Sequence, residues 1–277
     1  MLSRRHLQPF PRLRAIAGIL VLAALFGCMD EEVAGGTGVG NPPQGTATFA
    51  MAASSGDPLA KGTSSREAAR RFTLTDAGGT RFDLERAVAH VTWVRLRTPA
   101  GRPCRKELHS TCEAEDIRLE GPFVADLVNG TLSPDLPAFQ APAGAYRRIE
   151  ARLDDLDEDK AALEPALAGH SVVLSGTFAY AGRADRAFSL SLDFNELVRF
   201  EGGSMAVRQD TLTHLLLRFG VESWLKEIDI GRCLDEGRLV LDNQGNLKLD
   251  DGSNCDGLEK ALKEAVKASG RMSERNP

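Results

Sequence analysis

The sequence lacks the residue spacings that mark the commonest metal and catalytic sites. It contains no CxxC pair, and its histidines beyond the first 27 residues show no HxxxH or HxH spacing (His90, His109, His170 and His214). Ser204 lies in GGSMA, which ends in alanine where the GxSxG nucleophile elbow has glycine. The segment GGTGVG (35–40) does not keep the GxGxxG spacing of a nucleotide loop. We therefore interpret Ser204 as part of a surface loop, and we expect the histidines of apolar runs to be ordinary strand residues.

Positive charge is also scarce. The formal net charge is −5, and four of the arginines lie in the first 27 residues; without them, 30 basic residues face 39 acidic ones, which gives −9. Proteins that bind nucleic acid neutralise phosphates with lysine and arginine. No basic cluster is visible along the sequence, so we expect neither a nucleic-acid partner nor peripheral docking on anionic lipid.

The apolar segment AIAGILVLAALFG (15–27) is too short to span a bilayer as a helix. It follows a basic stretch without acids (Arg4, Arg5, Arg12 and Arg14), and this order is typical of a secretory signal peptide. Gly27 precedes Cys28, and Leu25 lies three residues before it, which resembles the bacterial lipobox, although Phe26 departs from that pattern. The resemblance implies that residues 1–27 are removed and that the Cys28 thiol is acylated. An ordinary signal peptide with an incidental cysteine is the alternative.

Acylation at Cys28 would place the protein at a membrane. Each buried CH₂ of an acyl chain contributes about 0.8 kcal/mol, so several chains, palmitate among them, make a stable anchor. Met29 stands where some bacteria use an aspartate to retain lipoproteins at the inner membrane, which favours the outer membrane. Residues 28–45 are rich in glycine, proline and acids, and predict a flexible tether with an end-to-end distance of roughly 20–25 Å.

Four cysteines remain after Cys28: Cys104, Cys112, Cys233 and Cys255. An even number in an exported chain indicates disulfide bonds, and three pairings are possible. We favour the two local ones, Cys104–Cys112 and Cys233–Cys255, each of which is expected to stabilise the fold by roughly 2–3 kcal/mol through the entropy of the unfolded chain. A four-cysteine metal site is the alternative.

Residues 46–221 predict short strands with almost no helix between them. Hairpins are expected at 72–84, around AGG, and at 170–196, where Phe188 to Phe194 alternate with polar residues. Further strands are expected at 46–53, 87–98, 116–128 (in two pieces broken at Gly121-Pro122), 145–153 and 209–221. This rhythm is typical of an antiparallel β-sandwich in a mainly β protein.

Residues 222–277 predict a small helix, hairpin and helix appended to the sandwich. A short helix carries Trp224, Leu225 and Ile228 inward, a hairpin turns at 243–245, and a second helix starts near Leu258; RMSERNP (271–277) is expected to be a loose tail. Leucines of the hairpin are expected to face the second helix and form a satellite core (Leu239, Leu241, Leu247 and Leu249 against Leu258, Leu262 and Val266). On this basis Cys233→Ser would leave the sandwich folded and expose residues beyond about 230 to protease.

Several short motifs resemble a family of bacterial lipoprotein domains of unknown function with an immunoglobulin- or transthyretin-like sandwich. These are Thr75-Asp76 at a strand end, Asp126-Leu127 before a loop, the P-x-G-x-Y-x-x-I stretch from Pro142 to Ile149, and L-D-F at 192–194. The resemblance extends over about 150 residues, from near Phe72 to near Gly220. It implies the fold and carries no active site.

Acidic clusters are the remaining candidates for a site. One covers 154–159, and the other supplies candidate calcium ligands in the C-terminal loop: Asp242, Asn246, Asp250 and Asp251. Neither matches the EF-hand pattern, and such residues also dominate solvated turns, so no metal is assigned. The sequence predicts a membrane-anchored, non-catalytic binding or structural module without a cofactor, whose partner is an envelope protein or glycan. An envelope hydrolase, metal-assisted or not, is the alternative; it would gather titratable side chains from several strands in one cleft.

Overall fold

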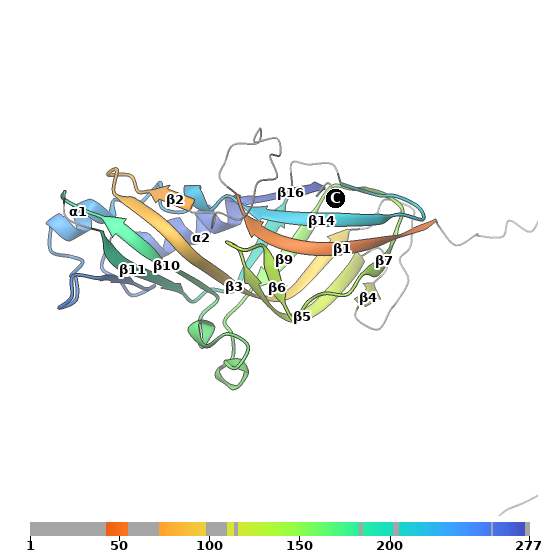
Figure 1. The fold of residues 1–277 in the computed structure, drawn as a ribbon, viewed down its shortest axis with the longest axis horizontal. Helices are drawn as coiled ribbons and strands as arrows, with labels where there is room; N and C mark the ends of the chain where they lie inside the picture. Colours follow the sequence, from red (N-terminus) through yellow and green to blue (C-terminus); the bar gives the residue numbers. More distant parts are fainter. Residues whose placement is uncertain are drawn as a thin grey trace, which may run out of the picture. The chain divides into compact units, whose positions relative to one another are not determined.

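The computed structural model describes residues 43–54, 72–97, 110–113, 116–182, 185–201, 205–255 and 257–274 (Figure 1). The chain divides into two units, Met1–Gly40 and Asn41–Pro277, and every described residue belongs to the second. The predicted signal peptide, Cys28 and Cys104 therefore lie outside the described residues, as do Ser204 and His109. The predicted tether also lies outside them, except for its last residues from Pro43 on. Cys112 is described only as a backbone position. Among the helices of the described residues, none is both long and apolar enough to cross a membrane.

The fold is mainly β, as predicted, and its larger sheet is built around one long strand, β3 (Arg81–Arg97). One edge of β3 pairs with β10 (Val172–Ala179) and then β9 (Ile149–Leu153), and the other with β2 (Phe72–Thr75) and then β5 (Asp116–Asp126). The sheet is completed by β4 (Ser110–Glu113), β6 (Thr131–Ser133), β11 (Arg186–Leu192), β12 (Glu196–Phe200) and β15 (Leu247–Leu249). The β2–β3 and β10–β11 hairpins confirm the two hairpin predictions.

β5 continues through Gly121-Pro122, where the sequence predicts a break. The register between β3 and β5 shifts between Val91 and Trp93, opposite these two residues. Because proline has no N–H to donate, it fits within a strand where the hydrogen-bond ladder is already interrupted. The irregularity therefore lets one strand run where two pieces are expected.

The smaller sheet has the order β16-β14-β1-β7. β1 (Gln44–Ala53) lies in parallel beside β14 (Leu212–Phe219) and antiparallel to β7 (Phe139–Pro142), and β16 (Gly270–Glu274) pairs with the far edge of β14 (Figure 1). A third, two-stranded sheet joins β8 (Gly144–Tyr146) and β13 (Met205–Val207). The β1–β14 and β11–β15 pairs are parallel, so the sheets are mixed rather than wholly antiparallel.

One apolar core is enclosed between the sheets and the C-terminal segment. Alternate residues of β1 point into it, and Phe200 of β12 meets Phe219 of β14 edge to face at 5.0 Å. At the other end of the large sheet, Phe82 contacts Phe178 and Phe188. Trp224 packs edge to face on Phe219 at 6.1 Å, which joins the C-terminal segment to the smaller sheet.

The C-terminal segment differs from its prediction in two of its elements. It contains η3 (Val221–Ser223), α1 (Ile230–Asp235) and α2 (Leu258–Ala268). Trp224, Leu225 and Ile228 are buried as predicted, but they follow a 3-10 turn and do not lie in the expected α-helix. The hairpin prediction at 243–245 is wrong: only β15 is a strand, and it pairs with the edge of β11. A two-stranded hairpin alone is marginal in water, whereas the edge of an existing sheet supplies both hydrogen bonds and apolar contacts.

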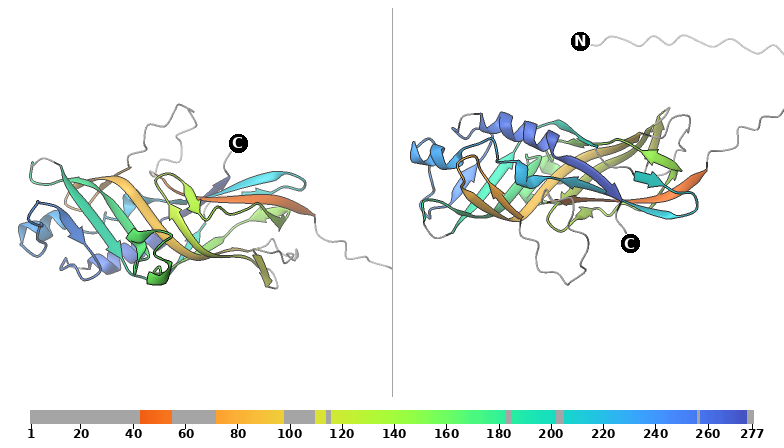
Figure 2. Two further views of the ribbon diagram at one scale, coloured as in Figure 1. Left: turned by 60° about the horizontal axis from the view of Figure 1, so that its bottom comes forward. Right: turned by 90° about the horizontal axis from the view of Figure 1, so that it is seen from above.

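The prediction of a loose tail at 271–277 is also wrong for its described residues, because β16 continues directly from α2 and pairs with β14 (Figure 2). Met272 of this strand is buried. The satellite core is likewise not separate, since Leu247, Leu258 and Leu262 belong to the same cluster as the sandwich core. The C-terminal segment therefore covers part of the main core.

A second, small cluster lies beneath the loop between β9 and β10 (Val88, Val124, Leu156, Leu167 and Val173). This loop carries η1 (Glu158–Lys160) and η2 (Pro165–Leu167). Residues 87–91 of β3 are buried in succession. The loop thus buries the middle of β3 on the face that points away from the main core.

Candidate functional site

A cleft of about 400 Å³ lies where two hairpin turns meet helix α1. Its walls come from the β2–β3 turn, from the β10–β11 turn and from the first turns of α1. The polar side chains that line it are Thr80, Tyr180, Asp229, Arg232 and Asp235. The cleft is therefore built by loops and one short helix, with the sheets behind it.

Asp76 connects two of these walls. It is 5% exposed, and its Oδ1 accepts a hydrogen bond from the Thr80 N–H at 2.7 Å, while its Oδ2 accepts one from the Gly231 N–H at 3.0 Å. The first bond closes the β2–β3 turn, and the second attaches that turn to α1. The aspartate of the Thr75-Asp76 motif therefore has a positioning role.

Two glycines allow the walls to approach each other closely. A Cβ atom on Gly78 would lie 2.4 Å from Asp229 Oδ1, and one on Gly231 would lie 2.7 Å from Thr80 Oγ1. Asp229 is also the N-cap of α1, because its Oδ1 accepts the Arg232 N–H at 2.8 Å. Residues with side chains at these two positions would push the turn and the helix apart.

The remaining wall is fixed by a side-chain hydrogen bond and by a disulfide. The Tyr180 hydroxyl of the β10–β11 turn donates to Asp235 Oδ1 of α1. The Cys233–Cys255 disulfide is present, as predicted, and links α1 to the segment before α2. Helix α1 is therefore held by hydrogen bonds to both turns of the cleft and by a covalent bond to the segment before α2. The predicted Cys104–Cys112 pair lies outside the described residues.

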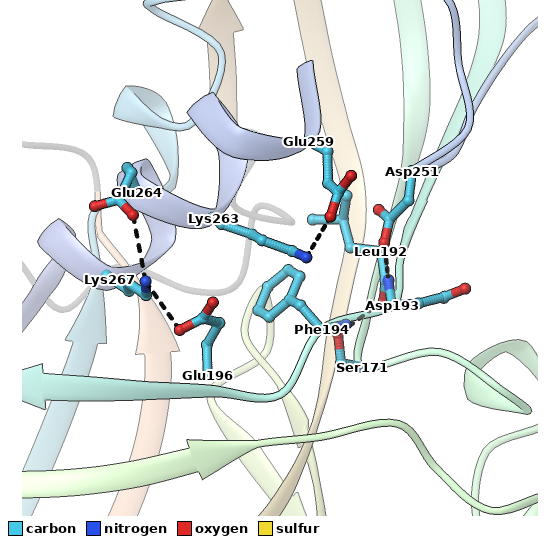
Figure 3. Close-up of polar contacts among 10 residues, drawn as sticks. All are labelled: Ser171, Leu192, Asp193, Phe194, Glu196, Asp251, Glu259, Lys263, Glu264 and Lys267. Atoms are coloured by element: carbon cyan, nitrogen blue, oxygen red, sulfur yellow. Dashed lines mark hydrogen bonds and ion pairs between the residues drawn. The ribbon is translucent and has the colours of Figure 1, made fainter. Parts of the chain in front are cut away.

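A second polar cluster surrounds the link between β11 and β12 (Figure 3). Asp251 Oδ2 accepts the Asp193 N–H at 2.9 Å. His170 Nδ1 also contacts Asp193 Oδ1. The Phe194 N–H donates to Ser171 Oγ at 3.2 Å, which fixes the L-D-F stretch beneath α2. These contacts bring together three segments that are separated in the sequence: residues 170–171, 193–194 and 251.

The carboxylates of this cluster have perturbed acidities. Burial raises the pKa of Asp155, and the neighbouring Asp193 and Asp154 raise it further. Burial also raises the pKa of Asp251, against the lowering effect of its hydrogen bond from Asp193. Carboxylates that resist ionisation are found both in active sites and in structural networks.

Lysines of α2 balance part of this negative charge (Figure 3). Lys263 pairs with Glu259 and lies 6.0 Å from the centre of the Phe194 ring, and Lys267 lies 3.0 Å from Glu196 of β12. The hydrogen bond that Lys263 donates to Glu259 raises the pKa of Lys263, and the one that Lys267 donates to Glu196 raises the pKa of Lys267. These pairs attach α2 to the β11–β12 link.

The candidate calcium ligands lie in two successive turns; Asp242, Asn246 and Asp250 take part in closing them, whereas Asp251 binds the Asp193 N–H. Asp242 accepts hydrogen bonds from the N–H groups of Gln244 and Asn246, which lowers its pKa, and Asp250 binds Ser253. Within the described ranges, no group of three or more His, Cys, Asp or Glu side chains is arranged to hold a metal ion. The geometry agrees with the alternative of ordinary turns.

The described histidines have separate partners. His90 is 3% exposed and its Nδ1 lies 2.8 Å from the Asp154 carbonyl; His214 Nδ1 lies 2.7 Å from Thr48 Oγ1 on the neighbouring strand. Only His170 joins a carboxylate side chain. The structure therefore does not bring the predicted candidates into one constellation.

The residues that build the cleft do not stand out in the sequence. Asp76 appeared only as part of a motif, and Tyr180, Asp229 and Asp235 were not singled out. The available signal was the pair of glycine-bearing turns, TDAGGT (75–80) and DIG (229–231), whose glycines allow close backbone approach.

No protein-family model, curated protein or solved structure matches this chain. The resemblance to bacterial lipoprotein domains therefore stays a prediction, and the site is argued from its own geometry.

Proposed function

We propose that this protein is a lipid-anchored module of the cell envelope that binds a polar ligand in the cleft and performs no chemistry on it. The observation that carries the proposal is the use of the cleft's carboxylates. Asp76 and Asp229 accept backbone N–H groups of the walls, and Asp235 accepts the Tyr180 hydroxyl. A general base needs a free lone pair directed at the substrate, so carboxylates used in this way favour holding a ligand over reacting with it.

The shape of the cleft supports a small polar ligand. A volume of about 400 Å³ lies within the range of small-molecule sites. Tyr180 supplies an aromatic ring. Arg232 supplies a guanidinium group that pairs only weakly with Glu236, because the distance between them is 3.9 Å. Such a mixture suits a sugar unit or a peptide end of an envelope polymer.

A photo-crosslinking residue tests the binding proposal in intact cells. Arg232 lines the cleft and is exposed, so p-benzoylphenylalanine in its place should give one discrete crosslinked species. Val240, which is 78% exposed and does not line the cleft, provides the matched control and should give none. Equal crosslinking at the two positions would contradict binding in the cleft.

The anchor has a separate test. The basic stretch, the apolar segment and the lipobox-like Cys28 support it. The wild-type protein should incorporate an alkyne-labelled palmitate and fractionate with membranes, whereas Cys28→Ala should do neither. A Cys28→Ala protein that remains in the membrane fraction, together with an unlabelled wild type, would overturn the anchor while leaving the cleft proposal intact.

The alternative of an envelope hydrolase is favoured by one observation, the contact of His170 with Asp193 beside two carboxylates of raised pKa. A panel of chromogenic esters and glycosides would test it. Turnover that is lost in Asp193→Asn, with unchanged thermal stability, would support hydrolysis over simple binding.

A further inference from the structure

The outer face of four neighbouring strands carries a regular lattice of arginine and acidic side chains around one tryptophan. On β3, Val94 and Leu96 are buried in the core, whereas Trp93, Arg95 and Arg97 alternate with them and point outward. β5 lies on one side of this part of β3 and β9 on the other (Figure 1). β12 pairs with the far edge of β9. We call this surface the arginine–tryptophan face.

The strand registers place these side chains in rows. In the central row, Arg95 stands opposite Arg118 of β5 and opposite Glu150 of β9, and Glu150 stands opposite Arg199 of β12. In the next row Trp93 lies between Glu120 and Arg152. The third row contains Asp116, Arg97, Arg148 and Glu201, with the last two joined as an ion pair. Strands lie about 4.8 Å apart, so the face spans roughly 14 Å across them.

Glu150 organises the centre of the face. Its side chain is only 2% exposed and receives two hydrogen bonds from Arg95, with Arg199 Nε 3.5 Å away on its other oxygen. A buried carboxylate needs such partners because its desolvation is costly. Glu150 therefore fixes the positions of two guanidinium groups on the surface.

Trp93 orients the guanidinium groups beside it. The Arg118 guanidinium carbon lies 4.8 Å from the ring centre, and that of Arg95 lies 5.4 Å from it. Stacking on an aromatic face uses the flat side of a guanidinium and leaves its N–H edges available to an anion. Here those edges face acids of the same surface, Glu150 for Arg95 and Glu120 for Arg118, so the tryptophan holds both ion pairs in place.

The charge of the face is opposite in sign to that of the chain. Six arginines stand among four acids (Arg95, Arg97, Arg118, Arg148, Arg152 and Arg199 against Asp116, Glu120, Glu150 and Glu201). The side chains of Arg97 and Arg152 form no hydrogen bond or ion pair with any residue that the structure describes. Arg199 is 60% exposed. An anionic partner would find at least two uncompensated guanidinium groups here.

We propose that the arginine–tryptophan face binds an acidic polysaccharide, with Arg97 and Arg152 pairing with carboxylates on separate sugars of one chain and Trp93 lying against a sugar ring. A guanidinium fork matches a carboxylate in two parallel hydrogen bonds. A flat face of four strands suits an extended chain better than a globular ligand. This surface is distinct from the cleft and does not depend on it.

Tryptophan fluorescence provides the binding assay with the full chain. The sequence has two tryptophans; Trp224 is 1% exposed, so Trp93 is the one that reports events at the surface. Titration with polygalacturonate oligomers should change the emission, and this change should weaken as salt is added. Neutral dextran should leave the emission unaltered, and Trp93→Phe should abolish the signal.

Matched substitutions locate the interaction. Arg97→Gln and Arg152→Gln should each raise the Kd for polygalacturonate about fivefold, and the double variant at least tenfold, since each removes one exposed ion pair with the ligand. Arg218→Gln, on the exposed side of β14, makes the same charge change elsewhere and should leave the Kd unchanged. Equal effects of all three single variants would reduce the proposal to non-specific charge attraction and overturn it. Binding to phosphatidylglycerol vesicles or to single-stranded DNA in the absence of polygalacturonate binding would also overturn it.

Discussion

Replacing Asp76 is expected to separate the two walls of the cleft. Its carboxylate accepts two buried backbone N–H groups, from Thr80 at 2.7 Å and from Gly231 at 3.0 Å. Asp76→Ala leaves both donors without a partner, and each unsatisfied buried group costs about 1–3 kcal/mol. We therefore expect the free energy of unfolding to fall by about 3 kcal/mol, and by about half of that in Asp76→Asn, which keeps one acceptor.

Urea denaturation followed by circular dichroism measures this loss directly. For a folded unit of this size the same loss corresponds to a fall in Tm of roughly 6–12 °C. Asp159→Ala, on the exposed η1 turn, is the matched control and should change stability by less than about 0.5 kcal/mol. A loss below about 1 kcal/mol in Asp76→Ala would refute the reasoning, because the two hydrogen bonds would then not hold the walls.

Three further predictions concern charge, the disulfide and the arginine–tryptophan face. Burial, Asp193 and Asp154 raise the pKa of Asp155 from its ordinary value of 3.8, so the stability it contributes is present below that value and is lost as the pH rises through the raised pKa. Asp155→Asn should therefore increase Tm at pH 7 and have little effect near pH 3, and a lower Tm at pH 7 would contradict this. Cys233→Ser should lower the free energy of unfolding by about 3 kcal/mol. Because β15, α2 and β16 belong to the common core, calorimetry should show one transition at lower temperature, whereas an early, separate loss of residues beyond 230 would favour an independent appendage. Glu150→Gln should lower the free energy of unfolding by about 2 kcal/mol, which is less than the usual 3–5 kcal/mol for a buried pair because Arg95 is 32% exposed. Glu120→Gln, at a 48% exposed site, should lower it by almost nothing in the same urea titration.

The parts of the fold that could be predicted are those whose signals are local. The β2–β3 turn has its glycines between two alternating strands, and β10 and β11 alternate on either side of a short turn, so both hairpins follow from neighbouring residues. The Cys233–Cys255 pair was chosen for the same reason. Burial of Trp224, Leu225 and Ile228 followed from their apolar character.

The parts that could not be predicted depend on partners far along the chain. Nothing local in RMSE (271–274) distinguishes a tail from a strand, because its pairing is decided by the free edge of β14. The same holds for β15, which takes the edge of β11 in place of a hairpin. The arginine–tryptophan face illustrates the limit most clearly: along the sequence its arginines lie in four separate segments, and only the registers of four strands gather them.

The position of β1 has a consequence for how the chain acquires its structure. β1 is the first strand of the folded unit, yet it is an inner strand of its sheet, and its Thr48 contacts His214, which lies 166 residues later. The parallel pairing therefore cannot form until the chain has been synthesised as far as β14. Long-range pairing of this kind slows folding, since a large loop must close before any contact rewards it. The first residues of β1 can pair with β7 earlier, but we expect the rest of this apolar strand to lack its β14 partner until then, so maturation should depend on chaperones that shield β1.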